Sequence, residues 1–273
     1  MALVERLNMR MSYSLYTFLA PNLQPLYQFI ADYLSHQLHL QFDLVVGQTY
    51  ADLRRADFCF ICGLPYVLRT PPRHPPLLQA LAAPVLHGSR YQDKPIYFSD
   101  VIVRHTSPAN SFADLQGCSW AYNEPESQSG YGITRYHLVT LGKTNGFFRQ
   151  VISAGFHQTA IQWVVAGQVE ATAIDSQVLA LELRDQPQLA QQIKIIDTLG
   201  PSSIQPFTAA PHIPPTLQAE LQRVLAEMHL EAAVQAQLER HGVQRFAIVE
   251  DASYDDIRRM LLACEQAQFL TLR

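Results

Sequence analysis

The sequence predicts an α/β fold, because short apolar strands alternate with amphipathic helices along most of its length. The 273 residues suffice for one large or two medium domains, and 48% of them are hydrophobic, so the chain can bury a core without disulfides or a structural metal. A charged fraction of 16% and a net charge of −4 exclude a disordered chain and a basic nucleic-acid surface.

The first half of the chain opens with alternating residues at 12–19, which is typical of a strand. Asn22 is placed to cap the helix that follows, whose apolar residues recur at helical spacing. The remaining expected elements are strands at 42–46, 58–62 and 96–103, a helical turn at 50–55, a Pro-rich loop at 70–76 and a short apolar segment at 77–83.

The second half repeats this rhythm, and Gly142 and Gly167 are placed to end two of its helices. Asp175 or Ser176 is expected to cap a third helix. The expected strands are 120–122, 151–153, 169–174, 193–196 and 204–209, and the expected helices are 133–141, 157–166, 176–183, 215–238 and 254–268.

Cys59 and Cys62 form a CxxC pattern, which is found in thiol–disulfide pairs and in zinc sites. Both lie in the apolar run 58–63, and no second CxxC or His pair follows nearby. Because free cysteine is among the most buried residue types, the pattern favours two structural core thiols.

Familiar catalytic signatures are incomplete in this chain. Gly142, Lys143 and Thr144 resemble the end of a P-loop, but His137 stands where its first glycine is required. The GxGxxG pattern that begins at Gly130 ends on Arg135, and neither GxSxG nor HExxH occurs. The sequence therefore predicts neither an enzyme nor a cofactor or metal.

The segment 123–132 follows an expected strand and opens an expected helix. The first N–H groups of a helix have no partner within it, and the helix dipole places partial positive charge there. Ser127, Ser129, Gly130 and Gly132 supply hydroxyls and allow close backbone approach, so the segment can bind an oxyanion. The alternative is that one serine merely caps the helix.

From about residue 43 to 260, the chain resembles the phosphate-, phosphite- and phosphonate-binding proteins of ABC importers. The Ser-x-Ser-Gly element, the downstream Gly-x-x-His and a strand-ending Asp characterise the resemblance as a set. The matching stretches are 97–103, 112–117, 120–132, 154–157, 167–176 and 199–206.

This resemblance implies a type II periplasmic-binding-protein fold, with two α/β lobes that each hold a mixed sheet with helices on both faces. Lobe one would comprise residues 1–97 and 206–273, lobe two residues 98–205, with crossover strands near Tyr97 and Gln205. A small phosphorus oxyanion (phosphonate, phosphite or phosphate) would bind in the cleft between the lobes. An ABC permease would be the partner, and the protein would be a monomer.

The resemblance also implies roles for matching residues of lobe two. Ser127, Gln128, Ser129 and Gly130 would bind the oxyanion at the start of the helix, and His157 would contact it from a second helix. Asp175 ends a strand, and a carboxylate there would suit a ligand that still carries a proton or an amine. The alternatives are a core or capping role for His157 and a helix-capping role for Asp175.

Lobe one would contribute Tyr66 and Tyr50, each of which follows a short turn after an expected strand. Arg135 lies near residues 127–132, here called the cradle, and either adds positive charge or faces solvent.

The N-terminal residues 1–11 contain no apolar core of a signal peptide, so the sequence as written predicts a cytoplasmic chain, whereas the family is periplasmic. An intracellular ligand sensor is therefore an alternative, and an enzyme built on the same fold is another. Neighbouring genes would separate these, because a permease and an ATPase indicate import, whereas a kinase or regulator indicates sensing.

Overall fold

A computed structural model describes residues 11–71 and 76–273. The chain divides into two compact units, each with its own sheet. Unit 1 comprises Met1–Pro95 and Ile204–Ser253, and unit 2 comprises Ile96–Ser203 and Tyr254–Arg273. No helix in the described part of the chain has the length and apolar character needed to cross a membrane.

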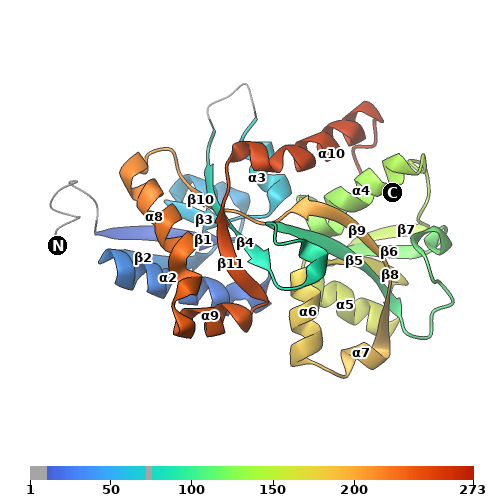
Figure 1. Ribbon diagram of the computed structural model, residues 1–273. Helices are drawn as coiled ribbons and strands as arrows, with labels where there is room; N and C mark the ends of the chain where they lie inside the picture. The colour runs from blue at the N-terminus through green and yellow to red at the C-terminus, as the bar shows by residue number, and fades with distance from the viewer. Residues whose placement is uncertain (1–10, 72–75) are drawn as a thin grey trace. The chain divides into compact units, whose positions relative to one another are not determined.

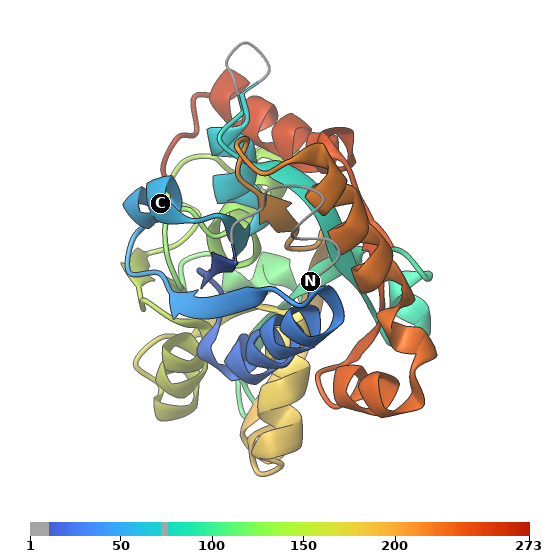
Figure 2. The ribbon, with the colours of Figure 1, turned by 90° about the vertical axis from the view of Figure 1, so that its left-hand side faces the viewer.

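Unit 1 has a six-stranded sheet in the order β11-β4-β10-β3-β1-β2. Helix α2 packs on β1 and β2, α8 packs on β4 and β11, and α9 packs on β11, so that these helices line the sheet (Figures 1 and 2). The strands are β1 (Ser12–Thr17), β2 (Gln41–Val46), β3 (Phe58–Phe60), β4 (Gln79–Leu86), β10 (Phe207–Ala209) and β11 (Val243–Ile248). The helices are η1 (Pro21–Leu23), α2 (Gln24–Leu38), η2 (Tyr50–Arg55), α3 (Gly63–Arg69), η3 (Ser89–Tyr91), α8 (Pro215–Glu227), η6 (Met228–Leu230), α9 (Ala232–Glu239) and η7 (Asp251–Tyr254).

Unit 2 has a five-stranded sheet in the order β7-β6-β8-β5-β9. Figure 1 shows α4 and α10 on one face of this sheet and α5, α6 and α7 on the other. The strands are β5 (Ile96–Arg104), β6 (Ser119–Tyr122), β7 (Gln150–Ser153), β8 (Ala171–Asp175) and β9 (Ile193–Ser203). The helices are η4 (Phe112–Leu115), the π-helical turn η5 (Gln128–Gly132), α4 (Ile133–Thr140), α5 (His157–Ala166), α6 (Ser176–Asp185), α7 (Leu189–Gln192) and α10 (Asp255–Gln266).

The two sheets share one topology, although the sequence shows no internal repeat. In unit 1, β1 pairs in parallel with β2 and β3, and the returning strand β10 pairs antiparallel with β3 and β4. In unit 2, β6 pairs in parallel with β7 and β8, and β5 pairs antiparallel with β8 and β9. Each unit is therefore a mixed α/β sheet, as the sequence predicts.

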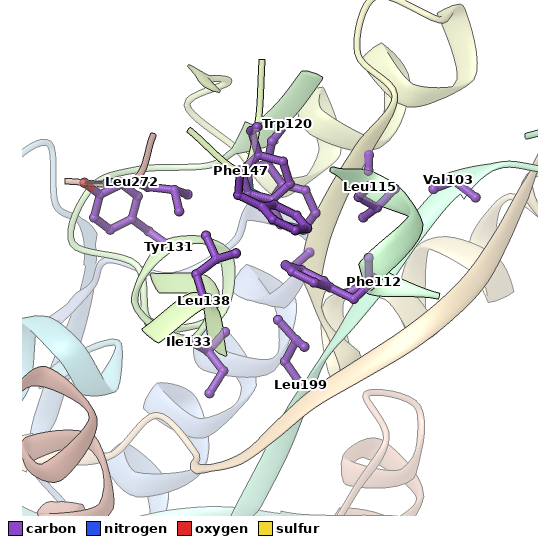
Figure 3. Packing of buried hydrophobic residues seen from close by; sticks show 14 of the residues in the cluster. Val103, Phe112, Leu115, Trp120, Tyr131, Ile133, Leu138, Phe147, Leu199 and Leu272 are labelled. Carbon is purple, nitrogen blue, oxygen red and sulfur yellow. Dashed lines mark hydrogen bonds between the residues drawn. The ribbon is translucent and has the colours of Figure 1, made fainter. Parts of the chain in front are cut away.

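Aromatic side chains form the centre of the unit 2 core (Figure 3). Trp120 of β6 stacks on Phe148 with 4.7 Å between ring centroids, and Phe112 stacks on Phe147 with 5.4 Å. All four rings are at most 4% exposed. This packing fixes β6 and therefore the segment that follows it.

Several elements differ from the sequence-based prediction. Strand β3 ends at Phe60, and the next residues turn into α3, which was not predicted. The segment predicted at 77–83 is the longer strand β4, and β11 was also not predicted. Asn22 does not cap α2, because Leu23 holds the cap position without a side-chain hydrogen bond.

The CxxC cysteines are structural in this fold. Cys59 and Cys62 are both buried, and no disulfide joins them. The Cys59 thiol lies 3.0 Å from the Thr208 hydroxyl, and burial raises its pKa to about 12. A thiol with this pKa stays protonated and is a poor nucleophile at neutral pH.

The C-terminal segment belongs to unit 2 and not, as the sequence analysis expects, to the lobe that holds the N-terminus. The chain therefore passes between the units at three places, after Pro95, Ser203 and Ser253, whereas two were expected. The reason is packing, because α10 packs on α4 and β9, and Phe269 and Leu272 complete the core of unit 2. Leu272 also donates its N–H to the Tyr131 hydroxyl at 3.0 Å.

We expect Phe269→Ala to lower the free energy of unfolding by about 3–5 kcal/mol, because the ring is 1% exposed and its loss leaves a cavity in the unit 2 core. The adjacent Leu270→Ala is the matched control, since Leu270 is 61% exposed and should change stability by no more than about 0.5 kcal/mol. Urea denaturation measures both. Equal effects would contradict the placement of the C-terminal segment.

Candidate functional site

The candidate residues of unit 2 follow the ends of its parallel strands. The segment Ser127–Gly130 comes after β6, His157 after β7, and Asp175 is the last residue of β8. Because β6 pairs in parallel with both β7 and β8, the carboxyl ends of the three strands lie at one edge of the sheet. This edge is where open α/β sheets bind ligands.

Ser127 begins the cradle as the N-cap of η5. Its hydroxyl accepts the N–H of Gly130 at 3.1 Å, and its carbonyl accepts the N–H of Gly132 at 2.8 Å. The capping role offered as the alternative for Ser127 is therefore observed. The five-residue π-helical turn widens the start of α4, and such turns occur frequently at functional sites.

Glycine at position 130 is required by close packing against Asn123. A Cβ atom at Gly130 would lie 2.1 Å from the Asn123 Oδ1 atom. Asn123 was not identified as a site residue from the sequence, although its position directly after β6 was a usable signal. The Asn123 amide oxygen therefore occupies the space that a side chain at position 130 would need.

A chain of hydrogen bonds connects the cradle with α5. The Ser127 and Ser129 hydroxyl oxygens lie 3.3 Å apart, and the Ser129 hydroxyl lies 2.9 Å from His157 Nε2. All three side chains are at least nine-tenths buried. The structure therefore brings together three of the residues that the sequence singles out, and their partners orient both hydroxyls.

His157 is a neutral imidazole at ordinary pH. The residue is 6% exposed, and burial lowers the pKa of its ring to about 4. A neutral ring has one donor and one acceptor nitrogen. Its Nδ1 atom has no hydrogen-bond partner in the described part of the chain, which leaves one nitrogen of the ring uncommitted.

Asp175 caps α6, as the alternative interpretation states. Its Oδ1 atom accepts the main-chain N–H groups of Gln177 at 2.8 Å and Val178 at 3.3 Å. The carboxylate is buried, and Asp175 is only 1% exposed. The additional ligand role stays a prediction.

Gln128 ties the cradle to the rest of unit 2. Its side-chain amide donates to the Ser202 hydroxyl at 3.1 Å and contacts the Met260 sulfur at 3.2 Å. The side chain thereby links η5 to β9 and α10. A contact between Gln128 and the ligand stays a prediction. The main-chain N–H of Gln128 is the group that could make this contact.

The tyrosines of unit 1 occupy the topologically equivalent places. Tyr50 begins η2 after β2. Its ring centre lies 5.2 Å from that of Phe18 and 4.5 Å from the Arg69 guanidinium carbon. Tyr66 lies within α3 after β3, is fully buried, and donates its hydroxyl proton to Asp251 Oδ1 at 2.8 Å. A ligand can receive the Tyr66 proton only if this bond opens.

Arg135 does not face solvent. It is 7% exposed, donates to the Leu270 carbonyl and lies 5.2 Å from the centre of the Tyr131 ring. It therefore fastens the C-terminal segment to α4. Across residues 11–71 and 76–273, no group of His, Cys, Asp and Glu side chains is arranged to hold a metal.

Solved structures show the fold to which this chain is similar. The chain is similar to a binding-protein component of an ABC phosphonate transporter from Pseudomonas aeruginosa, with TM-score 0.80, 16% identity, and coverage of 95% of this chain and 88% of that one. It is also similar to PhnD1 from Prochlorococcus marinus in complex with methylphosphonate, with TM-score 0.79, 16% identity and coverage of 95% and 99%. These likenesses show the two-lobed fold of periplasmic binding proteins.

The family follows from the sequence match. Residues 16–254 match the family described as "ABC transporter, phosphonate, periplasmic substrate-binding protein". Since this match covers most of the 273 residues, the chain belongs to the phosphonate-binding family of ABC transporter components. The family resemblance inferred from the sequence is confirmed, and the family consists of substrate-binding components rather than enzymes.

The cap at Asp175 gives a stability prediction. Asp175→Ala removes the acceptor of two N–H groups and should lower the free energy of unfolding by about 1 kcal/mol. Asp175→Asn keeps a side-chain oxygen that can cap, so its loss should be a few tenths of a kcal/mol. Chemical denaturation at pH 7 compares the two. An equal loss in both variants would contradict a simple capping role.

His157 gives a pH prediction. Its pKa is lowered from 6.5 to about 4 in the folded state, so the unfolded chain binds the proton first as pH falls. The stability this group contributes is complete above pH 6.5 and is lost as pH falls towards 4. Between pH 7 and pH 5, wild type should lose about 2 kcal/mol relative to His157→Gln.

Denaturation curves at the two pH values measure this difference. His105→Gln is the control, because His105 is exposed. If His157→Gln and His105→Gln respond alike to acid, the buried neutral imidazole is ruled out.

Proposed function

We propose that this chain binds a small phosphorus oxyanion, namely a phosphonate, phosphite or phosphate. The protein acts as a monomer and delivers the anion to an ABC permease. The observation that carries the proposal is the buried chain from Ser127 through Ser129 to His157, at the carboxyl edge of the unit 2 sheet. The family and the methylphosphonate complex of a structural relative support the same ligand class.

The donors at this edge suit a tetrahedral anion. Main-chain N–H groups at the start of η5 and the Ser129 hydroxyl offer hydrogen bonds without a formal charge. In the tautomer that suits this role, His157 Nε2–H donates to the Ser129 oxygen and leaves the hydroxyl proton free for the anion. The helix dipole adds partial positive charge at the same point. Donors fixed in a buried site bind an anion strongly, because little reorganisation is needed and water does not compete.

Asp175 is proposed to select among anions. A carboxylate near a bound anion is favourable only where the ligand retains a proton or carries an amine that it can donate. Phosphonate, phosphite and phosphate monoanions retain a proton, whereas sulfate does not. We also expect the ligand to be enclosed between the two lobes, with Tyr50 and Tyr66 contributed by lobe one. This enclosure and an action in the periplasm stay predictions.

Calorimetry tests the proposal directly. Methylphosphonate, phosphite or phosphate should bind to the purified protein, and sulfate should bind far more weakly. Ser129→Ala should weaken binding by about 1–3 kcal/mol, because a hydrogen bond to a charged ligand is lost in a buried site. Thr140→Ala is the matched control, since Thr140 lies at the far end of α4 and its hydroxyl bonds the His137 carbonyl.

Two results would contradict the proposal. One is sulfate affinity equal to or above that of every phosphorus oxyanion. The other is an equal loss of affinity in Ser129→Ala and Thr140→Ala.

A further inference from the structure

Phe156 occupies a position where a polar residue is preferred. It is the N-cap of α5, has extended backbone angles (φ −132°, ψ 154°) and makes no capping hydrogen bond through its side chain. Ser, Thr, Asp and Asn predominate at N-caps because their side chains accept first-turn N–H groups. The equivalent N-cap in unit 1, before η2, is Thr49, which forms a full capping box with Asp52. Unit 2 therefore forgoes a cap that unit 1 uses.

Phe156 also differs in its exposure from three phenylalanines in the core of unit 2. Phe112, Phe147 and Phe148 are at most 4% exposed and form the core, whereas Phe156 is 56% exposed. Folding of unit 2 therefore leaves most of this ring in water, although an aromatic ring gains free energy from burial. The apolar surface is available to a ligand.

The position of Phe156 relates this surface to the cradle. The next residue, His157, is buried and lies 2.9 Å from the Ser129 hydroxyl. The preceding Gly155 has φ +79° and donates its N–H to the Asn123 carbonyl at 2.8 Å, which ties the loop to the residue beneath Gly130. Phe156 thus lies between Gly155, which bonds Asn123, and His157, which contacts the Ser129 hydroxyl.

We infer that Phe156 is a specificity-determining residue that contacts the carbon substituent of a phosphonate. The inference rests on the proposed function and narrows it, because the site should prefer phosphonates with an apolar substituent over inorganic phosphate. Phosphate carries an oxygen where a phosphonate carries carbon. An oxygen placed against an aromatic ring loses its hydrogen bonds to water without replacement, whereas a methyl or phenyl group gains by the contact.

The test compares phenylphosphonate, methylphosphonate and phosphate by calorimetry on wild type, Phe156→Leu and Phe156→Ser. In Phe156→Ser, we expect the affinity for phenylphosphonate to fall by roughly ten-fold relative to that for phosphate, in the range that small apolar contacts supply. Phe156→Leu, which keeps an apolar surface, should retain most of the preference. Phe156→Ser should also gain an N-cap and melt no lower than wild type, which shows that it is folded.

Leu141→Ser is the matched control. Leu141 is 46% exposed and lies at the C-terminal end of α4, whereas the cradle lies at its start, so this change should leave the ratio of affinities unchanged. An unchanged ratio in Phe156→Ser, with wild-type binding intact, would overturn the role of Phe156 and leave the proposed function standing. A wild type that prefers phosphate to both phosphonates would also overturn it. Failure of wild type to bind any of the three would contradict the proposed function itself.

Discussion

Parallel pairing of β6 with both β7 and β8 is the constraint on which the candidate site depends. It sets three carboxyl ends at one edge, so residues from three separate stretches of the chain follow adjacent strands. The pairing is held by burial, because Trp120 anchors β6 in an aromatic core and β8 is buried throughout. Any loss of this core would move the cradle relative to α5.

Burial also sets the chemistry of the site. The environment that keeps His157 neutral makes its hydrogen bond to Ser129 hard to exchange for water, so the serine hydroxyl keeps one orientation. The close approach of Asn123 to Gly130 also packs the cradle backbone against the end of β6. The C-terminal segment adds a third support, since Met260 contacts the Gln128 amide. Neutral donors held in this way can bind an anion without a permanent positive charge.

Local patterns in the sequence were sufficient for most of unit 2. Strand alternation, the serine before η5, the αL glycine after α5 and the acidic cap of α6 depend on neighbouring residues, and the structure contains each of them. Long-range partners were not accessible in this way. Nothing near Tyr66 signals its bond to Asp251, 185 positions later. The apolar face of α10 predicts burial but does not say in which unit, and its packing on α4 decided that.

The two units share a topology, so their differences indicate where function departs from folding. At the second helix start, unit 1 has a capping box at Thr49, whereas unit 2 has an exposed Phe156 and a buried, neutral His157. At the first, unit 1 has a short 3₁₀ turn before α2, whereas unit 2 has a π-helical turn that contains the buried Ser129 and is capped by the buried Ser127. Each departure breaks a local rule that favours stability, and both lie at the carboxyl edge of the unit 2 sheet. Natural sequences tend to break such rules at functional sites. We therefore propose that the ligand-binding chemistry is concentrated in unit 2, on a frame that unit 1 shares.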